Sequence, residues 1–192
     1  MKPNLPIYKV TLDESEKTGV FAMSFVQSPA VECDFIYFSE NLEYISFQSD
    51  ERRIVTGVVL RPNQLIYRNS NGFEYYLQFD KEAIEKARDK FHKYNYTSNV
   101  TLEHSNPTYD VYLVESYLVN RSRQIVPVEF SDIEDGAWIL SYKVDNLELW
   151  NSIKESNKFN GFSIEAVIIP ELVKNSKIQY INKLLSNIKN FS

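Results

Sequence analysis

Apolar and polar positions alternate with period two through much of the chain, which predicts a protein built mainly of strands. The stretch 160–169 shows this most clearly. Phe162 and Ile164 share one face, and Ser163 and Glu165 share the other. A small hydroxyl therefore lies on a largely apolar strand, beside a glycine that leaves open space next to it. Ser163 is a candidate nucleophile if a base reaches it.

Similar runs predict strands along the rest of the chain. They cover residues 7–10, 20–26, 35–38, 44–47, 53–60, 65–67, 73–79, 99–104, 111–119 and 137–144. Asn69-Ser70-Asn71-Gly72 predicts a hairpin turn between two of them. Pro170 is expected to close the strand that carries Ser163.

Helical spacing follows two good capping positions. Asp80 is a good N-cap, and the apolar residues after it recur every three to four positions, which predicts a helix over residues 81–94. Asp145 or Asn146 is expected to cap a second, shorter helix that ends near Ile153. The sequence thus combines many strands with a few helices.

Three segments are predicted along the 192 residues, a length that suits one domain with a real core. Residues 1–49 form an N-terminal arm of short strands, and residues 50–170 form the main β domain. Residues 171–192 form a C-terminal amphipathic helix or tail. Two interpretations of this tail are open. It packs on its own domain, or it binds a partner such as a scaffold protein.

Composition excludes several classes of function. The net charge of −5 gives no general attraction to nucleic acid or to an anionic membrane, and no apolar run is long enough to span a bilayer. The N-terminus lacks the apolar segment of a secretory signal. The chain has one cysteine, Cys33, and two histidines at wide spacing, which match no zinc pattern. We therefore expect no metal and no cofactor.

The two histidines differ in their surroundings. His92 lies one position off the apolar stripe of the first helix, between lysines, and is expected to be solvated. His104 ends the predicted strand 99–104 on its apolar face, with Val100 and Leu102. A partly buried imidazole there suits a general base. The spacing alone favours a structural histidine that a backbone carbonyl satisfies, so both interpretations stay open.

A carboxylate for the base comes from the strand 111–119. Its odd-numbered face is apolar except for Glu115, and an unpaired buried charge is costly, so Glu115 needs a donor such as an imidazole N–H. The opposite interpretation is that this face meets solvent. Ser163, His104 and Glu115 then form a candidate nucleophile, base and orienter.

Seven pieces of the chain together resemble the tailed-phage prohead proteases, which are serine proteases of capsid maturation. The pieces are 54–63, 66–68, 74–76, 100–105 (Val-Thr-Leu-Glu-His-Ser), 114–116 (Val-Glu-Ser), 143–146 and 161–165 (Gly-Phe-Ser-Ile-Glu). The resemblance covers about residues 50–170. Each piece alone is weak, and the specificity comes from their common order and spacing.

This resemblance implies a fold and a chemistry. The family is related to the herpesvirus assemblins, which implies an α+β, mainly β fold with a closed or nearly closed β-barrel and surrounding helices. The family's base corresponds to His104 and its nucleophile to Ser163. Glu115 is the expected third member, with Asp110 as runner-up. No arginine follows Ser163 on its strand, unlike in assemblins, so oxyanion donors are sought in the polar loop 121–135, which holds Arg121 and Arg123.

The implied function is a serine endopeptidase that cleaves scaffold and major capsid protein, and itself, inside the prohead in the cytoplasm of the infected bacterial host. Assemblins are activated by dimerisation, so a homodimer is a further expectation. One alternative is a non-catalytic virion or scaffold-associated structural module on the same barrel, which the apolar stripe of the tail favours. A small-molecule esterase on the same scaffold is another.

Overall fold

The computed structural model describes residues 5–30, 52–155 and 159–173. The strands are β1 (Ile7–Thr11), β2 (Gly19–Val26), β3 (Ile54–Leu60), β4 (Ile66–Ser70), β5 (Phe73–Gln78), β6 (Val100–Leu102), β7 (Asn106–Pro107), β8 (Val111–Leu118), β9 (Trp138–Val144), β10 (Gly161–Val167) and β11 (Ile169–Leu172). The helices are α2 (Lys81–Lys93) and α3 (Leu147–Glu155), and three short 3₁₀-helices lie at 96–98, 121–123 and 128–130. The predicted strands 35–38 and 44–47, Cys33 and most of the predicted tail lie outside the described residues.

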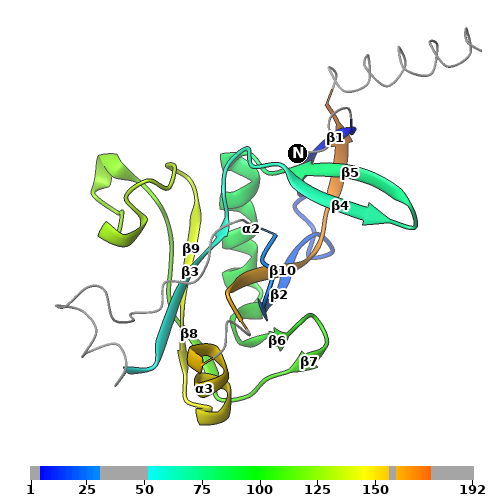
Figure 1. Ribbon diagram of the computed structural model, residues 1–192. Helices are drawn as coiled ribbons and strands as arrows, with labels where there is room; N and C mark the ends of the chain where they lie inside the picture. Colours follow the sequence, from blue (N-terminus) through cyan, green and yellow to red (C-terminus); the bar gives the residue numbers. More distant parts are fainter. Residues whose placement is uncertain (1–4, 31–51, 156–158, 174–192) are drawn as a thin grey trace, which may run out of the picture.

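The strands form three sheets (Figure 1). The first sheet has the order β11-β1-β5-β4, the second β10-β2-β6-β7 and the third β3-β9-β8. β1 and β2, which come from the segment predicted to be an N-terminal arm, are both inner strands. β2 lies between β10 and β6, so this segment supplies the centre of the second sheet.

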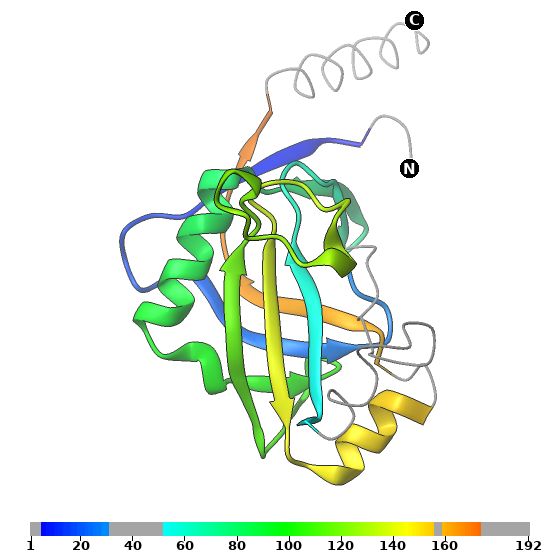
Figure 2. The same cartoon turned by 90° about the vertical axis from the view of Figure 1, so that its left-hand side faces the viewer.

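The second and third sheets pack face to face around the main core. Figure 2 shows β3, β8 and β9 upright, with β10 and β2 crossing behind them at a steep angle. Phe162 of β10 contacts the rings of Phe25 and Tyr142, with centroids 5.2 and 5.7 Å away. Helix α2 closes one side, where Phe91 packs against Trp138 at 5.6 Å. Aromatic pairs at these distances contribute to stability beyond their buried area.

The predicted closed or nearly closed barrel is wrong. Among the described residues, no strand pairing closes any of the three sheets on itself, and the molecule is mainly β with separate sheets. β10 and β3 are edge strands of different sheets that lie close to each other, and no ladder of hydrogen bonds joins them. The alternating pattern specifies strands and faces, whereas closure needs a ladder between two particular edges.

Most of the predicted local elements are confirmed. Asp80 caps α2, because its carboxylate accepts a hydrogen bond from Ala83 N at 2.8 Å. Asn146, one of the two predicted caps of α3, accepts from Leu149 N at 2.9 Å. The predicted hairpin turn joins β4 to β5, where Asn71 and a glycine adopt positive φ. No helix in the described ranges is long and apolar enough to cross a membrane.

Two predicted strand ends differ from the structure. Pro170 does not end the extended chain. It lies in β11, opposite Val10 of β1. Proline is tolerated there because β11 is an edge strand, where a missing N–H leaves no inner ladder bond unmade. Strand β6 ends at Leu102, so His104 lies beyond it in a turn.

Candidate active site

Ser163 lies on the outer face of the second sheet. Its neighbour Phe162 points into the main core, so the Ser163 side chain points away from the third sheet. Ser163 is directly opposite Ser24 of β2, and Ser24 is directly opposite Thr101 of β6. Three hydroxyl side chains therefore form one row across three neighbouring strands.

Burial differs little between the two serines of this row. Ser163 is 9% exposed and Ser24 is fully buried. The Ser24 hydroxyl lies 3.4 Å from the Thr101 carbonyl oxygen, to which it donates. No hydrogen bond joins the Ser163 hydroxyl to another residue of the described ranges. The Ser163 hydroxyl is thus available to a base or to a ligand.

His104 lies in a strained turn between β6 and β7. Ser105 N donates to Leu102 O at 3.1 Å, and the two central residues, Glu103 and His104, have φ of 49° and 56°. Turns of this left-handed type prefer Asn-Gly, because other residues crowd their own backbone. Such conformations cost on the order of 1 kcal/mol or more per residue and gather at functional sites.

Three hydrogen bonds tie this turn to β2 and the residue that follows it. Glu103 N donates to Phe25 O at 3.0 Å, and the Glu103 carboxylate accepts from Gln27 N at 2.7 Å. His104 N donates to the Ser24 hydroxyl at 2.9 Å. These contacts stabilise the turn. They also hold the His104 backbone beside Ser24, which is directly opposite Ser163 in the sheet.

The turn changes the face on which the His104 ring lies. The alternating pattern placed His104 with Leu102 on the apolar face, but two left-handed residues carry the ring to the Thr101 side. The ring is exposed there, not partly buried as the strand pattern predicts, with Nδ1 3.5 Å from Oε1 of Glu165. The same Oε1 accepts a hydrogen bond from the Thr101 hydroxyl at 2.5 Å.

The structure thus gathers Ser163, His104 and Glu165 on one face of the second sheet. No hydrogen bond joins Ser163 to His104. Ser24 links them, because it is directly opposite Ser163 and its hydroxyl accepts from His104 N. In resting enzymes the contacts between catalytic groups are often long and tighten only with substrate. The catalytic roles of Ser163 and His104 stay predictions.

Glu115 lies on a different surface. It is opposite Ser141 of β9, and its carboxylate accepts from the Ser141 hydroxyl at 2.6 Å. Ser141 shares a second hydrogen bond of 2.9 Å with Thr56. Ile139, two residues earlier on β9, faces a second apolar cluster and not the main core, so this row is on the outer face of the third sheet. Glu115 as the orienting acid stays a prediction, and this geometry gives it no contact with His104.

Asp110, the runner-up for the third position, lies just before β8. Its backbone carbonyl accepts hydrogen bonds from Asp145 N at 2.7 Å and from Asn146 N at 3.3 Å. These bonds join the start of β8 to the end of β9. The Asp110 contacts in the described residues are therefore structural ones.

His92 forms a serine–histidine pair with Ser116 on β8, away from Ser163. Its Nε2 lies 2.7 Å from the Ser116 hydroxyl, which also accepts from Trp138 Nε1 at 3.0 Å. Burial, followed by the nearby Arg88, lowers the pKa of His92. The expectation that His92 is simply solvated is therefore incomplete, because this pair ties the end of α2 to β8.

Arg121 is engaged within its own loop. Its guanidinium pairs with Asp135 at 2.8 Å and donates to the carbonyl oxygens of Ser131 and Ile133 at 2.8 and 2.5 Å. Ile133 packs with Val58 of β3 in the cluster on the outer face of the third sheet. This places the Arg121 loop on the side of the molecule away from Ser163.

Residues 41–169 match the model of a family described as "Putative phage serine protease XkdF". The match covers about two thirds of the chain. The chain belongs to this family. No curated protein and no solved structure matches the chain. The coarser part of the predicted resemblance, a phage serine protease family, is confirmed. Its likeness to assemblins and its prohead role stay predictions.

The stretch matched by the XkdF family model contains Ser163, His104 and Glu115. It also contains Thr101 and Glu165, which touch each other beside His104. Ser24 lies outside it. No group of three or more histidine, cysteine, aspartate or glutamate side chains in the described ranges could hold a metal ion.

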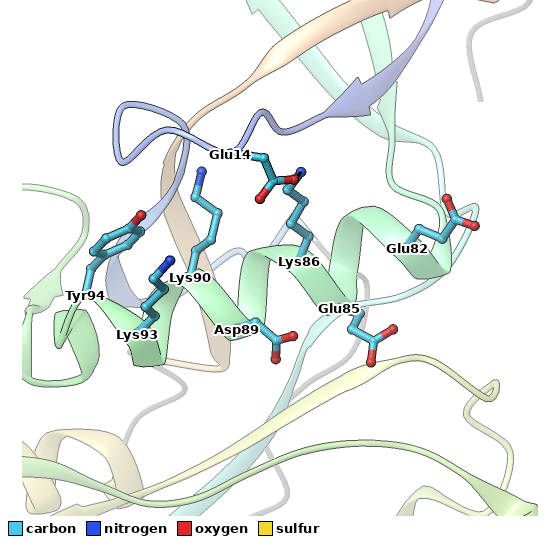
Figure 3. Close-up of a pocket in the computed structure, with 8 residues that line it drawn as sticks. All are labelled: Glu14, Glu82, Glu85, Lys86, Asp89, Lys90, Lys93 and Tyr94. Atoms are coloured by element: carbon cyan, nitrogen blue, oxygen red, sulfur yellow. Dashed lines mark hydrogen bonds and ion pairs between the residues drawn. The ribbon is translucent and has the colours of Figure 1, made fainter.

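The hollow along α2 is a different surface from the Ser163 face. Figure 3 shows it lined by charged side chains, with Lys86 beside Glu14 and Lys90 directed toward the loop before β2. Lys86 pairs with Glu14. Lys90 is buried and donates to Asp13 O, Ser15 O and Thr18 Oγ1. These lysines hold the β1–β2 loop on α2, and this hollow contributes nothing to the serine site.

Ser24, Thr101 and Glu165 were not among the predicted site residues. Ser24 is the lone hydroxyl inside the apolar run of β2, and Glu165 shares the face of Ser163 on β10. Both signals are visible in the sequence. What the sequence does not contain is the order of β10, β2 and β6, which places all three residues together.

Proposed function

We propose that this protein is a serine endopeptidase in which Ser163 is the nucleophile and His104 is the general base and acid. One observation carries the proposal. The backbone of His104 is anchored to Ser24, directly opposite Ser163, on a face where the Ser163 hydroxyl is bonded to no described residue. Membership of a phage serine protease family supports it.

The chemistry follows from these positions. Nε2 of His104 takes the proton of Ser163 as Oγ attacks the scissile carbonyl carbon of a peptide. The imidazolium then gives that proton to the leaving amine as the C–N bond breaks, which leaves an acyl group on Ser163. A water molecule, deprotonated by His104, attacks this ester, and the proton returns to Ser163 Oγ as the acid is released.

The biological substrates belong to the same proposal. We infer that the enzyme acts inside the prohead, in the cytoplasm of the infected bacterial host. There it cleaves scaffold and major capsid protein, and itself, during capsid maturation. Support comes from the phage family of the chain and from the resemblance of residues 50–170 to prohead proteases. A homodimer is a further part of this proposal.

Labelling with a fluorophosphonate tests the nucleophile. Full-length protein is treated with the probe, and the labelled residue and rate are determined by mass spectrometry. We expect labelling at Ser163, none in Ser163→Ala, and a fall of roughly 10³-fold or more in His104→Ala. Ser116 and His92 supply matched controls. Ser116→Ala and His92→Gln remove a serine and a histidine that lie at hydrogen-bond distance between β8 and α2. Labelling that is lost in these controls and kept in Ser163→Ala would refute the assignment.

Co-expression tests the substrate class. The protease gene is expressed with the scaffold and major capsid protein genes of its own phage, and processing is followed by intact mass. We expect cleavage with wild-type protein and none with Ser163→Ala. Uncleaved partners in the presence of a protein that labels at Ser163 would reject these substrates while leaving the hydrolase chemistry in place.

One observation favours the alternative of a non-catalytic virion or scaffold-associated structural module. No hydrogen bond joins Ser163 to His104 in this structure, as in a fold that has lost catalysis. The two proposals differ in one measurement. A structural module gives no labelling of Ser163, even when the scaffold and capsid protein are added.

A further inference from the structure

We propose that Glu165 is the positioning residue for His104, in place of a carboxylate from the third sheet. Glu165 holds the ring by Nδ1, so that Nε2 is the nitrogen presented to Ser163. The proposal deepens the function above and rests on Ser163 and His104 acting as nucleophile and base.

The contacts of Glu165 are the first observation that supports this role. Its Oε1 is 3.5 Å from Nδ1 of His104, and no lysine or arginine in the described part of the chain pairs with it. The Thr101 hydroxyl donates to the same oxygen at 2.5 Å and so fixes the direction of the carboxylate. Glu165 is half-buried, which leaves its charge less screened than a fully solvated one.

The spacing on β10 carries the second step. Ser163 and Glu165 are separated by one residue and share a face, so their backbones are about 6.7 Å apart. Because the Glu165 contact is made by Nδ1, Nε2 is the ring nitrogen that we assign to Ser163, on the same face of β10 as Glu165.

The turn at Glu103 and His104 is the third observation that supports this role. Because Glu103 and His104 are both left-handed, the ring is placed over Thr101 and Glu165, and the bond from His104 N to Ser24 keeps it there. A shift of well under 1 Å brings Nδ1 from 3.5 Å to hydrogen-bond distance of Oε1. Glu115 has no such route, because its carboxylate binds Ser141 on the outer face of the other sheet.

The chemical consequence is a choice of tautomer. A neutral imidazole whose Nδ1–H donates to a carboxylate keeps Nε2 free to accept the serine proton. The carboxylate also stabilises the imidazolium that forms in the transition state. In serine proteases the wrong tautomer costs about 10⁴-fold in rate, so loss of Glu165 should lower reactivity by roughly 10²–10⁴-fold.

The tautomer can be measured without any catalysis. Full-length protein with ¹⁵N-labelled histidine and His92→Gln contains one imidazole, that of His104. The ¹⁵N chemical shifts of its two ring nitrogens are recorded at about pH 8.5, above the ordinary pKa range of histidine side chains. We expect the Nδ1–H form in this background, the Nε2–H form after Glu165→Thr, and the Nδ1–H form again in Glu165→Gln, which keeps an acceptor.

Glu115→Thr is the matched control, because it removes a carboxylate from a strand of the other sheet by the same change. We expect its tautomer to equal that of the background. An unchanged spectrum in Glu165→Thr, or a switch in Glu115→Thr, would overturn the proposal. Circular dichroism spectra equal to that of the background show that each variant is folded, and Thr101→Val provides a second variant, expected to weaken the Nδ1–H preference.

Fluorophosphonate labelling separates the two levels of the argument. We expect Glu165→Thr, which switches the tautomer, to label at Ser163 roughly 10²–10⁴-fold more slowly than wild type, and Glu115→Thr to label at the wild-type rate. A wild-type protein that does not label at all sinks the proposed function, while the tautomer experiment still decides the contact. A Glu165→Thr variant that labels at the wild-type rate sinks the positioning role alone.

Discussion

Replacing Ser24 by alanine removes one of the three hydrogen bonds that hold the His104 turn. The Ser24 hydroxyl is fully buried and accepts from His104 N at 2.9 Å. Loss of a hydrogen-bond partner costs about 1 kcal/mol for a donor that water can reach and up to about 3 kcal/mol for a buried one. We therefore expect Ser24→Ala to lower the free energy of unfolding by that amount, measured by urea denaturation.

Ser24→Ala should also slow the reaction of Ser163 with the probe. Glu103 and His104 are held in a strained turn, and removing one anchor shifts the population toward relaxed forms in which the ring is misplaced. Since about 1.4 kcal/mol corresponds to a tenfold change in an equilibrium, 1–3 kcal/mol predicts a roughly 5- to 150-fold fall in the rate of Ser163 labelling.

Ser141→Ala is the matched control for this experiment. Ser141 is also fully buried and binds two polar side chains, Thr56 and Glu115, on the outer face of the third sheet. We expect a similar loss of stability, with Ser163 labelled at the wild-type rate. If Ser24→Ala labels as fast as wild type, or if Ser141→Ala slows labelling equally, the anchoring argument is refuted.

Three more predictions follow from individual contacts. Burial lowers the pKa of His92 in the folded protein, so its stabilising effect is complete above about pH 6.5 and is lost as the pH falls below that value toward the folded pKa. His92→Gln should therefore flatten the fall of the urea midpoint between about pH 7 and 5.5, and an equally steep fall would contradict this. Phe162→Ala removes the ring that packs on Phe25 and Tyr142 and should cost about 3–5 kcal/mol in urea unfolding, and a loss below about 1 kcal/mol would argue against this packing. Arg121→Gln should cost about 1 kcal/mol and leave Ser163 labelling unchanged, whereas slower labelling would return Arg121 to the oxyanion site.

Several parts of the fold could be predicted locally because they depend on neighbours in the chain. The hairpin at Asn71, the caps at Asp80 and Asn146 and the face of Ser163 all follow from residue type and spacing. Side chains on a strand alternate whatever the strand pairs with. These predictions therefore need no knowledge of the rest of the molecule.

His104 shows where this kind of inference fails. Strict alternation predicts that His104 shares the face of Leu102, but Glu103 and His104 both adopt left-handed conformations, which reverse the face on which the ring lies. Non-glycine residues rarely adopt such conformations without outside support. The support comes from Phe25, Ser24 and Gln27, which are remote in the chain.

The strand carrying Ser163 and the apolar side of each sheet follow from the order of residues alone, because a pleated backbone sets the direction of each side chain. The residues that surround His104 cannot be predicted in this way. Thr101 and Glu165 are 64 residues apart and meet only through the pairing of β10 with β2 and of β2 with β6. The absence of a barrel among the described strands has the same origin. Pairing between edges is decided by hydrogen bonds across the whole molecule, and no local pattern encodes it.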